Sequence, residues 1–260
     1  MLIFKPMTLQ AYFDDSGERD QAVGGCIASV DAWSAFRTEW QDVLAQFDIE
    51  WFHANAFEHG NSGFTPANKS DRTSFLNRLL EVLVRNISPI TGGAFVYAIA
   101  GPELVQHLNA RGKLGKEPPK RGKTPPEKWV DRMVKTLSDP YSVCLGHALR
   151  GTLELTIGGQ DTIQIFIAHQ PNHTESIEYI RKMLGGAPRF SGRLAGLEYG
   201  KKMQPKDILP LQAADFAAYY LSRKNRSPSN SRAWVADKLQ PQFPFIVPDP
   251  GWLTERWGTY

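Results

Sequence analysis

The stretch LQAYFDDSG at residues 9–17 is apolar and aromatic until it reaches two adjacent aspartates and a Ser-Gly pair. Such a composition favours a β-strand, and the turn-forming residues Ser16–Asp20 are predicted to end it. A second apolar run, Ala22–Val30, follows directly, so the two runs are predicted to form an antiparallel hairpin at the N-terminus. Side chains alternate along a strand, and Asp14 and Asp15 are therefore expected on opposite faces of the sheet.

Apolar residues recur at helical spacing after the hairpin. Trp33, Phe36, Trp40 and Val43 follow one another three or four residues apart, which predicts an amphipathic helix with Asp31 as its N-cap. The same reasoning predicts further helices at residues 70–87, 140–155, 174–184 and 210–223, and strands at residues 90–100, 162–168 and 194–199. This order of elements predicts an α/β fold, in which a mixed sheet with an antiparallel start is flanked by helices.

Length and composition bound the kind of protein. The chain has 260 residues, of which 42% are apolar and 22% charged, as in ordinary globular domains. No apolar run approaches the roughly 18 residues of a membrane span, and the first ten residues lack the pattern of a secretory signal. We therefore expect a cytoplasmic protein without a membrane partner. Two cysteines, Cys26 and Cys144, exclude a disulfide framework and a Cys-type zinc site; reduced buried thiols are expected, with one disulfide between them as the alternative.

The net charge of +3 is unevenly distributed along the chain. Residues 111–128 contain seven basic and two acidic residues, a local charge of +5, so the remainder of the chain carries −2. Four prolines in the same segment prevent a regular helix or a central strand there. We expect a single domain over residues 1–225 with a basic, Pro-rich insertion at residues 110–128, and a Pro- and Trp-rich extension, residues 226–260, that packs on this domain.

A short polar stripe runs along the last predicted helix. Gln212, Asp215, Tyr219 and Ser222 are three or four residues apart in a helix that is otherwise mostly apolar. Asp215 is therefore expected to be partly buried, where an unpaired carboxylate costs several kcal/mol. Two kinds of partner remain open for it: a metal ion, or an Arg or Tyr side chain that merely locks the helix in place.

Two groups of histidines are candidates for chemistry. His53 interrupts an apolar segment as Phe-His-Ala, and His169 and His173 flank Gln-Pro-Asn after the strand predicted at residues 162–168. The proline between His169 and His173 argues against a helical pair of zinc ligands. A structural role is the alternative for each of these histidines.

Three motifs in this order, Asp14–Gly17, Phe52–Ala54 and Leu211–Asp215, resemble those of the bacterial domain-of-unknown-function family 3800. Members of that family open with a strand ending in Asp-Glu-Ser-Gly, carry a Phe-His-Ala element, and close with Leu-Gln-x-Ala-Asp in a late helix. The resemblance spans residues 9–223. It implies a ribonuclease-H-like fold in which Asp14, on the first strand, and Asp215, on the last helix, help to hold a divalent metal ion.

The chain departs from the family pattern at two positions. Asp15 stands where the family has Glu, and Ile-Ala-His-Gln at residues 167–170 stands where a strand of the family often ends in an acid. His169 is therefore the candidate replacement, as a ligand or as a base. Glu198, in the next predicted strand, is a further candidate metal ligand, and Glu58 is a reserve acid.

The resemblance and the basic insertion together imply a nuclease. Phosphodiester hydrolysis would use Mg²⁺ or Mn²⁺ as cofactor, because hard oxygen ligands select these ions. Asp14, Asp215, His53 and His169 are the predicted catalytic residues. Carboxylates repel phosphates, so a basic element must recruit the nucleic acid. The predicted substrate-binding residues are Lys113, Lys116, Lys120, Arg121, Lys123 and Gln212.

Three alternatives remain. The missing acid near His169 also fits a nucleic-acid- or protein-binding module that has lost its metal site. An enzyme acting on another phosphate compound ranks lower, because the sequence has no Gly-rich phosphate loop. The basic insertion itself also has the pattern of a solvated linker or a partner-docking loop.

Overall fold

The fold is that of a computed structural model of the 260-residue chain. It describes residues 8–16, 22–60, 69–87, 94–100, 140–154, 161–227, 229, 231–239 and 243–247. The strands are β1 (Thr8–Ser16), β2 (Ala22–Ser29), β3 (Ala94–Ala100), β4 (Thr162–Ile167), β5 (Leu194–Glu198) and β6 (Phe243–Val247). The helices are α1 (Val30–Gln46), α2 (Ala54–Glu58), α3 (Lys69–Asn86), α6 (Pro140–Glu154), α7 (Thr174–Gly186), α8 (Leu209–Arg226) and α9 (Ala233–Leu239), with 3-10 turns η2 (Pro171–His173) and η3 (Pro188–Phe190). No helix within these residues is long and apolar enough to span a membrane.

The strands form one mixed sheet in the order β5-β4-β1-β2-β3-β6. β1 and β2 pair antiparallel, as do β2 and β3, whereas β4 runs parallel to β1 and β5 parallel to β4. β6 runs parallel to β3 at the other edge. The predicted N-terminal hairpin and the mixed α/β sheet are therefore confirmed. Because β1 lies between β4 and β2, its acidic end is placed in the interior of the sheet rather than at an edge.

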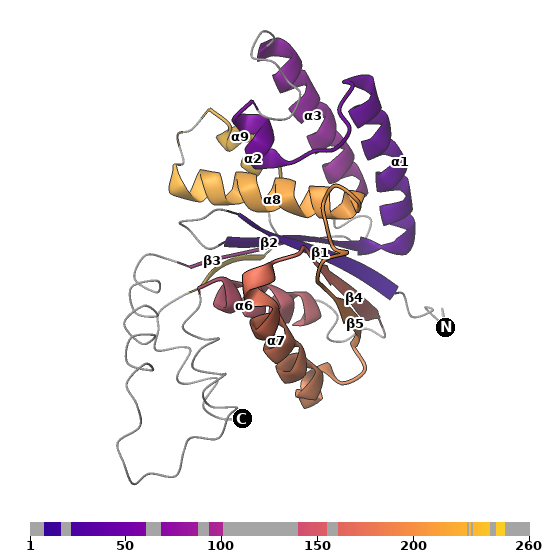
Figure 1. Cartoon of the computed structure of the whole chain (residues 1–260), viewed down its shortest axis with the longest axis vertical. Coiled ribbons are helices and arrows are strands. Elements are labelled where there is room, and N and C mark those ends of the chain that lie inside the picture. The colour runs from indigo at the N-terminus through magenta and orange to yellow at the C-terminus, as the bar shows by residue number, and fades with distance from the viewer. Residues whose placement is uncertain are drawn as a thin grey trace, which may run out of the picture.

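Helices cover both faces of the sheet, α1, α3, α8 and α9 on one and α6 and α7 on the other (Figure 1). Tyr12, Cys26 and Phe216 belong to the cluster on the α8 face. Phe13 and Cys144 belong to the cluster on the α6 face. Tyr12 and Phe13 are neighbours in β1, so their separation follows from the alternation of side chains along a strand. Cys26 and Cys144 are free and buried on opposite faces, which excludes a disulfide between them.

The helix α8 approaches the sheet unusually closely at Gly24. A Cβ atom at this position would lie 2.5 Å from the Cα atom of Ala218, so the packing requires glycine. Asp14 is opposite Gly24 in the β1–β2 ladder, and Asp215 lies one helical turn before Ala218. The close approach therefore sets α8 directly over the acidic end of β1.

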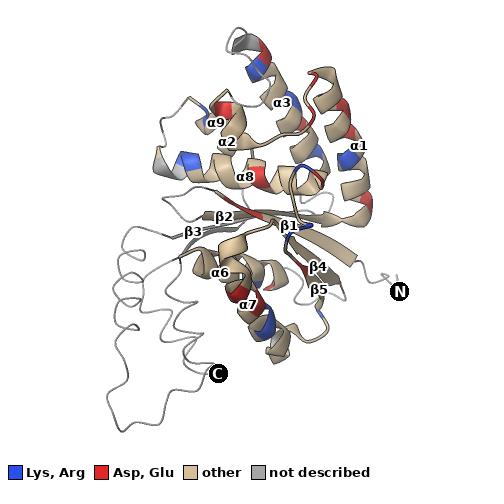
Figure 2. Ribbon diagram, viewed as in Figure 1, with Lys and Arg blue, Asp and Glu red and all other residues tan. Residues whose placement is uncertain are grey.

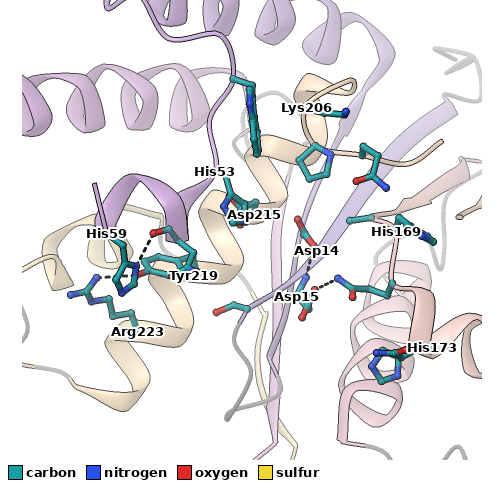
Figure 3. Close-up of a pocket in the computed structure, with 18 of the residues that line it drawn as sticks. Asp14, Asp15, His53, His59, His169, His173, Lys206, Asp215, Tyr219 and Arg223 are labelled. Atoms are coloured by element: carbon teal, nitrogen blue, oxygen red, sulfur yellow. Dashed lines mark hydrogen bonds between the residues drawn. The ribbon is translucent and has the colours of Figure 1, made fainter. Parts of the chain in front are cut away.

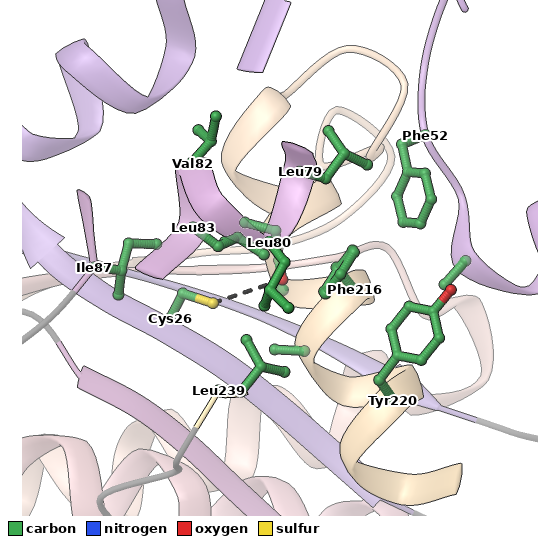
Figure 4. Close-up of a cluster of buried hydrophobic side chains, with 14 of the residues drawn as sticks. Cys26, Phe52, Leu79, Leu80, Val82, Leu83, Ile87, Phe216, Tyr220 and Leu239 are labelled. Atoms are coloured by element: carbon green, nitrogen blue, oxygen red, sulfur yellow. Dashed lines mark hydrogen bonds between the residues drawn. The ribbon is translucent and has the colours of Figure 1, made fainter. Parts of the chain in front are cut away.

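Helices α3 and α8 contribute to one apolar cluster on this face of the sheet (Figure 4). Leu79 and Leu83 of α3 and Phe216 of α8 are fully buried in it. The Sγ atom of Cys26 donates to the carbonyl oxygen of Ala213, 3.6 Å away. This cluster holds α8 against the sheet and therefore fixes the positions of the side chains that α8 carries.

Charged residues are mostly on the outer helices, whereas the end of β1 and the middle of α8 carry acids close to the sheet (Figure 2). Acidic side chains are rarely buried in a protein interior unless they are paired or have a functional role. The basic insertion predicted at residues 110–128 lies outside the described residues.

Two differences from the predicted elements have physical causes. The N-cap of α1 is Ser29, whose side chain accepts the N–H of Ala32 at 3.2 Å, and not Asp31, so the predicted cap is wrong by two residues. Asp31 lies in the first turn instead, where its negative charge interacts favourably with the helix dipole.

From the C-terminal extension, α9 adds buried Val235 and Leu239 to the α8-side cluster, and β6 extends the sheet.

Candidate active site

A cavity of about 1180 Å³ lies where the end of β1, the middle of α8 and the segments after β4 and before α2 meet. Three acids, four histidines and two basic residues line it: Asp14, Asp15, Asp215, His53, His59, His169, His173, Lys206 and Arg223 (Figure 3). All four predicted catalytic residues, Asp14, Asp215, His53 and His169, belong to this lining. The fold thus brings together side chains from distant parts of the sequence.

Asp14 and Asp215 meet from two different elements. Asp14, at the end of β1, is 9% exposed, and Asp215, in the middle of α8, is 4% exposed. Figure 3 shows the two carboxylates facing the same space, with His53 beside Asp215. The Oδ1 atom of Asp14 accepts the N–H of Asp15 at 2.8 Å, and the Oδ2 atom of Asp215 accepts the N–H of Ala54 at 2.6 Å. In the part of the chain that the structure describes, neither acid forms an ion pair with a lysine or an arginine.

Both carboxyl groups have raised pKa values. Burial raises the pKa of Asp14 well above its ordinary value of 3.8, and the negative charges of Asp215 and Asp15 raise it further. Burial raises the pKa of Asp215 to about 6, although the nearby His53 and the Ala54 hydrogen bond oppose the shift. The ionised pair is therefore unfavourable when no cation is bound, and a bound cation would remove the penalty.

Asp15 follows Asp14 on the opposite face of β1, yet its carboxyl group stays close enough to interact with that of Asp14, and both residues line the cavity. The Nε2 atom of Gln170 donates a hydrogen bond to the Oδ1 atom of Asp15. Burial raises the pKa of Asp15, while its hydrogen bonds and the nearby His173 lower it. Because β1 ends at the cavity, Asp15 still borders it. Gln170 therefore holds the carboxylate of Asp15 through its side-chain amide.

His53 caps the N-terminus of the short helix α2. Its Nδ1 atom accepts the N–H of Ala56 at 3.3 Å. The neutral imidazole therefore carries its proton on Nε2, which makes that atom a hydrogen-bond donor. The ring also lies against Trp51, with 5.7 Å between the ring centroids. Cap and ring contact together fix the orientation of the imidazole at the cavity.

Two buried polar atoms at the cavity have no hydrogen-bond partner within the described residues, Ser16 Oγ and His169 Nδ1. Ser16 is 4% exposed and lies two residues after Asp14, on the same face of β1. His169 is held through its backbone, whose N–H donates to the carbonyl oxygen of Met203 at 2.8 Å. An unpaired buried polar atom costs about 1–3 kcal/mol, so Ser16 Oγ would gain by binding a ligand. The ring of His169 extends away from Asp14 and Asp215 (Figure 3).

Gln212 does not contact the cavity, which corrects its prediction as a substrate-binding residue. It is fully buried, and its Oε1 atom accepts from Trp40 Nε1 and from the N–H of Phe52, both at 3.0 Å. Its Nε2 atom donates to the carbonyl oxygen of Pro205 at 3.0 Å. Gln212 and Asp215, one turn apart on α8, therefore hold the segment that carries His53. Of the two partners left open for Asp215, an Arg or Tyr side chain is not observed among the described residues; the backbone N–H of Ala54 donates to it instead.

The two further glutamates predicted for the site lie elsewhere. Glu198 is exposed on the edge strand β5, where Gln164 Nε2 donates to it at 3.0 Å, and it does not line the cavity. Glu58 accepts from the hydroxyl of Tyr220 at 2.7 Å and pairs with Arg232 at 3.2 Å. Neither carboxylate is therefore available to complete a site with Asp14 and Asp215.

Lys206 and Arg223 line the cavity and are not among the predicted residues. Arg223 follows Asp215 by two turns of α8, and its Nη1 atom donates to the hydroxyl of Tyr219 at 3.0 Å. Continuing the polar stripe of this helix beyond Tyr219 would have reached Arg223. Lys206 precedes α8, and no sequence pattern marks it. The predicted contacts Lys113, Lys116, Lys120, Arg121 and Lys123 lie outside the described residues.

The donor set suits a hard cation held by few protein ligands. Among the described residues, no group of three or more His, Cys, Asp or Glu side chains is arranged to hold a metal ion. Asp14 and Asp215 nevertheless supply buried carboxylate oxygens, and Asp215 Oδ1 makes no hydrogen bond within the described residues. Mg²⁺ commonly keeps several waters and takes one or two carboxylates together with substrate phosphates. The two acids therefore fit this ion or Mn²⁺, and not a closed structural site.

Comparisons of the chain with family models, with curated proteins and with solved structures find no match. Function is therefore inferred from the cavity. Two buried acids, an oriented imidazole and two nearby cationic side chains can together act on a phosphate ester.

Proposed function

We propose that this protein is a Mg²⁺- or Mn²⁺-dependent nuclease of ribonuclease-H-like fold, which hydrolyses phosphodiester bonds of nucleic acid. One observation carries the proposal: Asp14 and Asp215 are buried side by side at a large cavity, and no lysine or arginine of the described residues forms an ion pair with either. An acid at the end of the first strand beside an acid on the last long helix is also what the family resemblance implies.

Asp14 and Asp215 would hold the cation. When bound, it would supply electrostatic stabilisation of the charge that develops on the phosphoryl oxygens. Their raised pKa values support this role, because a divalent cation offsets the repulsion and desolvation that disfavour the ionised pair. Asp15, held by Gln170, adds negative charge at the rim of the same site.

The imidazoles supply proton transfer and hydrogen bonding in this proposal. His53 presents its Nε2–H, since Nδ1 is engaged by Ala56, and it is suited to donate to a phosphate oxygen or to the leaving oxygen. His169 lines the cavity and remains the candidate base, but its ring extends away from Asp14 and Asp215 (Figure 3) and would have to turn toward them to act. Its position after β4 is where the family often has an acid, so the base would replace a carboxylate there.

The proposal is tested by digestion of end-labelled RNA, single-stranded DNA and an RNA–DNA hybrid with Mg²⁺ or Mn²⁺. Wild type and Asp42→Asn, an exposed acid on α1 used as the matched control, are expected to cleave at least one substrate equally well. Asp14→Asn and Asp215→Asn are expected to lose on the order of 100-fold or more, because each removes a charged ligand. Cleavage by wild type no faster than by Asp215→Asn on every substrate would reject the proposal.

A second candidate is a binding module without catalysis. It is favoured by one observation, that Gln170 and His169 stand where a third acid is expected and Asp15 is already bonded to Gln170. In this case the chain binds nucleic acid, and the Asp215→Asn variant binds it at least as well as wild type. The cleavage assay separates the two candidates.

A further inference from the structure

The cavity is larger than one nucleotide requires. Its volume of about 1180 Å³ exceeds the roughly 300–1,000 Å³ typical of pockets for small ligands. Asp14 and Asp215 are buried at it, so a phosphate that reaches them must enter the cavity together with its neighbours in the chain. The dimensions therefore suit a segment of a polymer better than a free nucleotide.

Two cationic side chains lie on opposite sides of the acidic centre. Figure 3 shows Lys206 to one side of Asp14 and Asp215, and Arg223 to the other. Arg223 is eight residues after Asp215 in α8, which corresponds to about 12 Å along the helix axis. Lys206 precedes the first turn of the same helix. Each cationic side chain is therefore placed to contact a phosphate other than the one at the carboxylates.

The charge at the Arg223 end is positive overall. Arg223 lies 3.7 Å from Glu58, and Arg232 lies 3.2 Å from the same carboxylate. The three side chains together carry one positive charge. Lys206 is exposed, and the structure gives it no ion pair among the described residues. Both ends of the cavity can therefore attract phosphates, although its centre is acidic.

The cavity also offers an aromatic ring to a base. Trp51 borders it, half-buried, and its ring is supported by His53. Aromatic rings of this kind stack on bases that are already unstacked, which single strands provide and intact duplexes do not. At the centre, the buried hydroxyl of Ser16 has no partner within the described residues, so a donor is available for a phosphate oxygen.

We infer that the cavity binds a single strand of nucleic acid that runs along α8. One phosphate lies at Asp14 and Asp215 and accepts a hydrogen bond from Ser16, while Lys206 and Arg223 contact the phosphates on either side of it. A base of the strand stacks on Trp51. This inference rests on the nucleic-acid part of the proposed function and adds the strandedness of the substrate and its path. It does not require cleavage.

The test is fluorescence anisotropy with a labelled 12-nucleotide single strand and its duplex over a range of salt concentrations. Ca²⁺ replaces Mg²⁺ or Mn²⁺ so that the two carboxylates are neutralised, and a gel confirms that the strand stays intact. Arg223→Gln keeps a hydrogen-bonding side chain in the Glu58 and Tyr219 cluster, and Lys182→Ala on α7, on the other face of the sheet, is the matched control. Thermal melting of each variant identifies any that has lost its fold, and Lys206→Ala changes only an exposed loop residue.

The single strand is expected to bind more tightly than the duplex. Lys206→Ala and Arg223→Gln are each expected to reduce the slope of log affinity against log salt by about 0.7, and Lys182→Ala to leave it unchanged. Trp51→Ala is expected to weaken binding by about 5- to 150-fold without changing the slope. Ser16→Ala is expected to weaken binding while Ser16→Thr, which keeps the hydroxyl, restores it.

Duplex binding as tight as single-strand binding would overturn the inference, as would unchanged salt slopes in both Lys206→Ala and Arg223→Gln. These outcomes are independent of the nuclease proposal. A chain that binds single strands in this way but cleaves nothing would keep the inference and reject the nuclease, and a chain that cleaves only duplexes would do the reverse.

Discussion

At the scale of single residues, the carboxylates of Asp14 and Asp215 oppose the stability of the fold that contains them. Burial and the charges of the neighbouring acids raise the pKa of Asp14, and burial raises the pKa of Asp215 to about 6. A group whose pKa is higher in the folded than in the unfolded chain stabilises the fold when protonated and loses that contribution as pH rises. Groups of this kind are concentrated at functional sites.

Replacing Asp215 by Asn is therefore expected to stabilise the protein at alkaline pH when divalent ions are absent. The contribution of Asp215 is complete below about pH 4 and lost as pH rises through 6, so Asp215→Asn should exceed wild type in unfolding free energy by roughly 2–3 kcal/mol at pH 8. Urea unfolding in EDTA at pH 5 and pH 8 measures this. The difference should shrink at pH 5, and Asp42→Asn should show none; a variant less stable than wild type at pH 8 contradicts the assignment.

The sequence is informative about these residues only where a motif or a pattern marks them. Asp14 and His53 lie in short motifs, and Asp215 interrupts an apolar helix, so all three could be predicted. Gln212 belongs to the same polar stripe as Asp215, but its side-chain amide is hydrogen-bonded to Trp40, Phe52 and Pro205. Sequence periodicity cannot distinguish such a buried network from a ligand-binding face. Lys206 is marked by no pattern at all.

At the scale of elements, the distance between α8 and the sheet is set by one glycine. Gly24→Ala would place a Cβ atom 2.5 Å from the backbone of Ala218, and the helix must move to admit it. A loss of about 1–3 kcal/mol or more is expected from overpacking, measured by urea unfolding. Because Asp215 moves with α8, Mn²⁺ binding should weaken as well.

Gly146→Ala is the control for this change. Gly146 lies inside α6, where an added Cβ atom meets no other atom within 4 Å. Replacing a glycine by alanine within a helix stabilises it by about 1 kcal/mol. If both alanine variants lower stability to the same extent, the close approach at Gly24 is not the cause.

The attachment of the His53 segment to α8 depends on Gln212. Gln212→Ala leaves the indole N–H of Trp40 and the backbone N–H of Phe52 without their acceptor, in a fully buried place. A loss of about 2–4 kcal/mol in unfolding free energy is expected by urea titration. Gln46→Ala, at an exposed position at the end of α1, should change stability by less than about 0.5 kcal/mol. A neutral Gln212→Ala would show that this network is not needed.

Most helices and strands could be predicted, because apolar periodicity is strong in them. The predicted helix at residues 174–184 is α7, Thr174–Gly186, and the predicted strand at residues 162–168 is β4, Thr162–Ile167. The strand β6 was not predicted: proline at position 244 disfavours a strand, and β6 pairs as an edge strand, where proline is tolerated. Local signals also cannot choose between two candidate cap residues as close in sequence as Ser29 and Asp31.

At the scale of the whole molecule, the sheet order places the acidic end of β1 between two layers of helices, and the cavity lies where this end meets α8 and the segments after β4 and before α2. Strand order and the close approach of α8 are long-range properties, so sequence periodicity alone could not show that Asp14 and Asp215 meet. The uneven charge could be seen from the sequence. Under the proposed function, the acidic centre would repel an anionic substrate, and the basic segment would be the element that recruits it.

Deleting residues 110–128 is therefore expected to weaken binding of nucleic acid and to reduce its salt dependence. The segment lies outside the described residues, and its residues 111–128 carry a net charge of +5. Binding measured by anisotropy at two salt concentrations checks this. Mn²⁺ binding should be unchanged, because Asp14 and Asp215 are elsewhere in the chain, and unchanged nucleic-acid affinity would assign the segment to another partner.

The central claim, that Asp14 and Asp215 together form a divalent cation site, is tested most directly by calorimetric titration of Mn²⁺ into the metal-free protein at pH 7.5. We expect saturable binding to wild type and to Asp42→Asn, and no binding in the same concentration range to Asp14→Asn or Asp215→Asn. Absence of binding to wild type, or equal affinity in all four proteins, would contradict it.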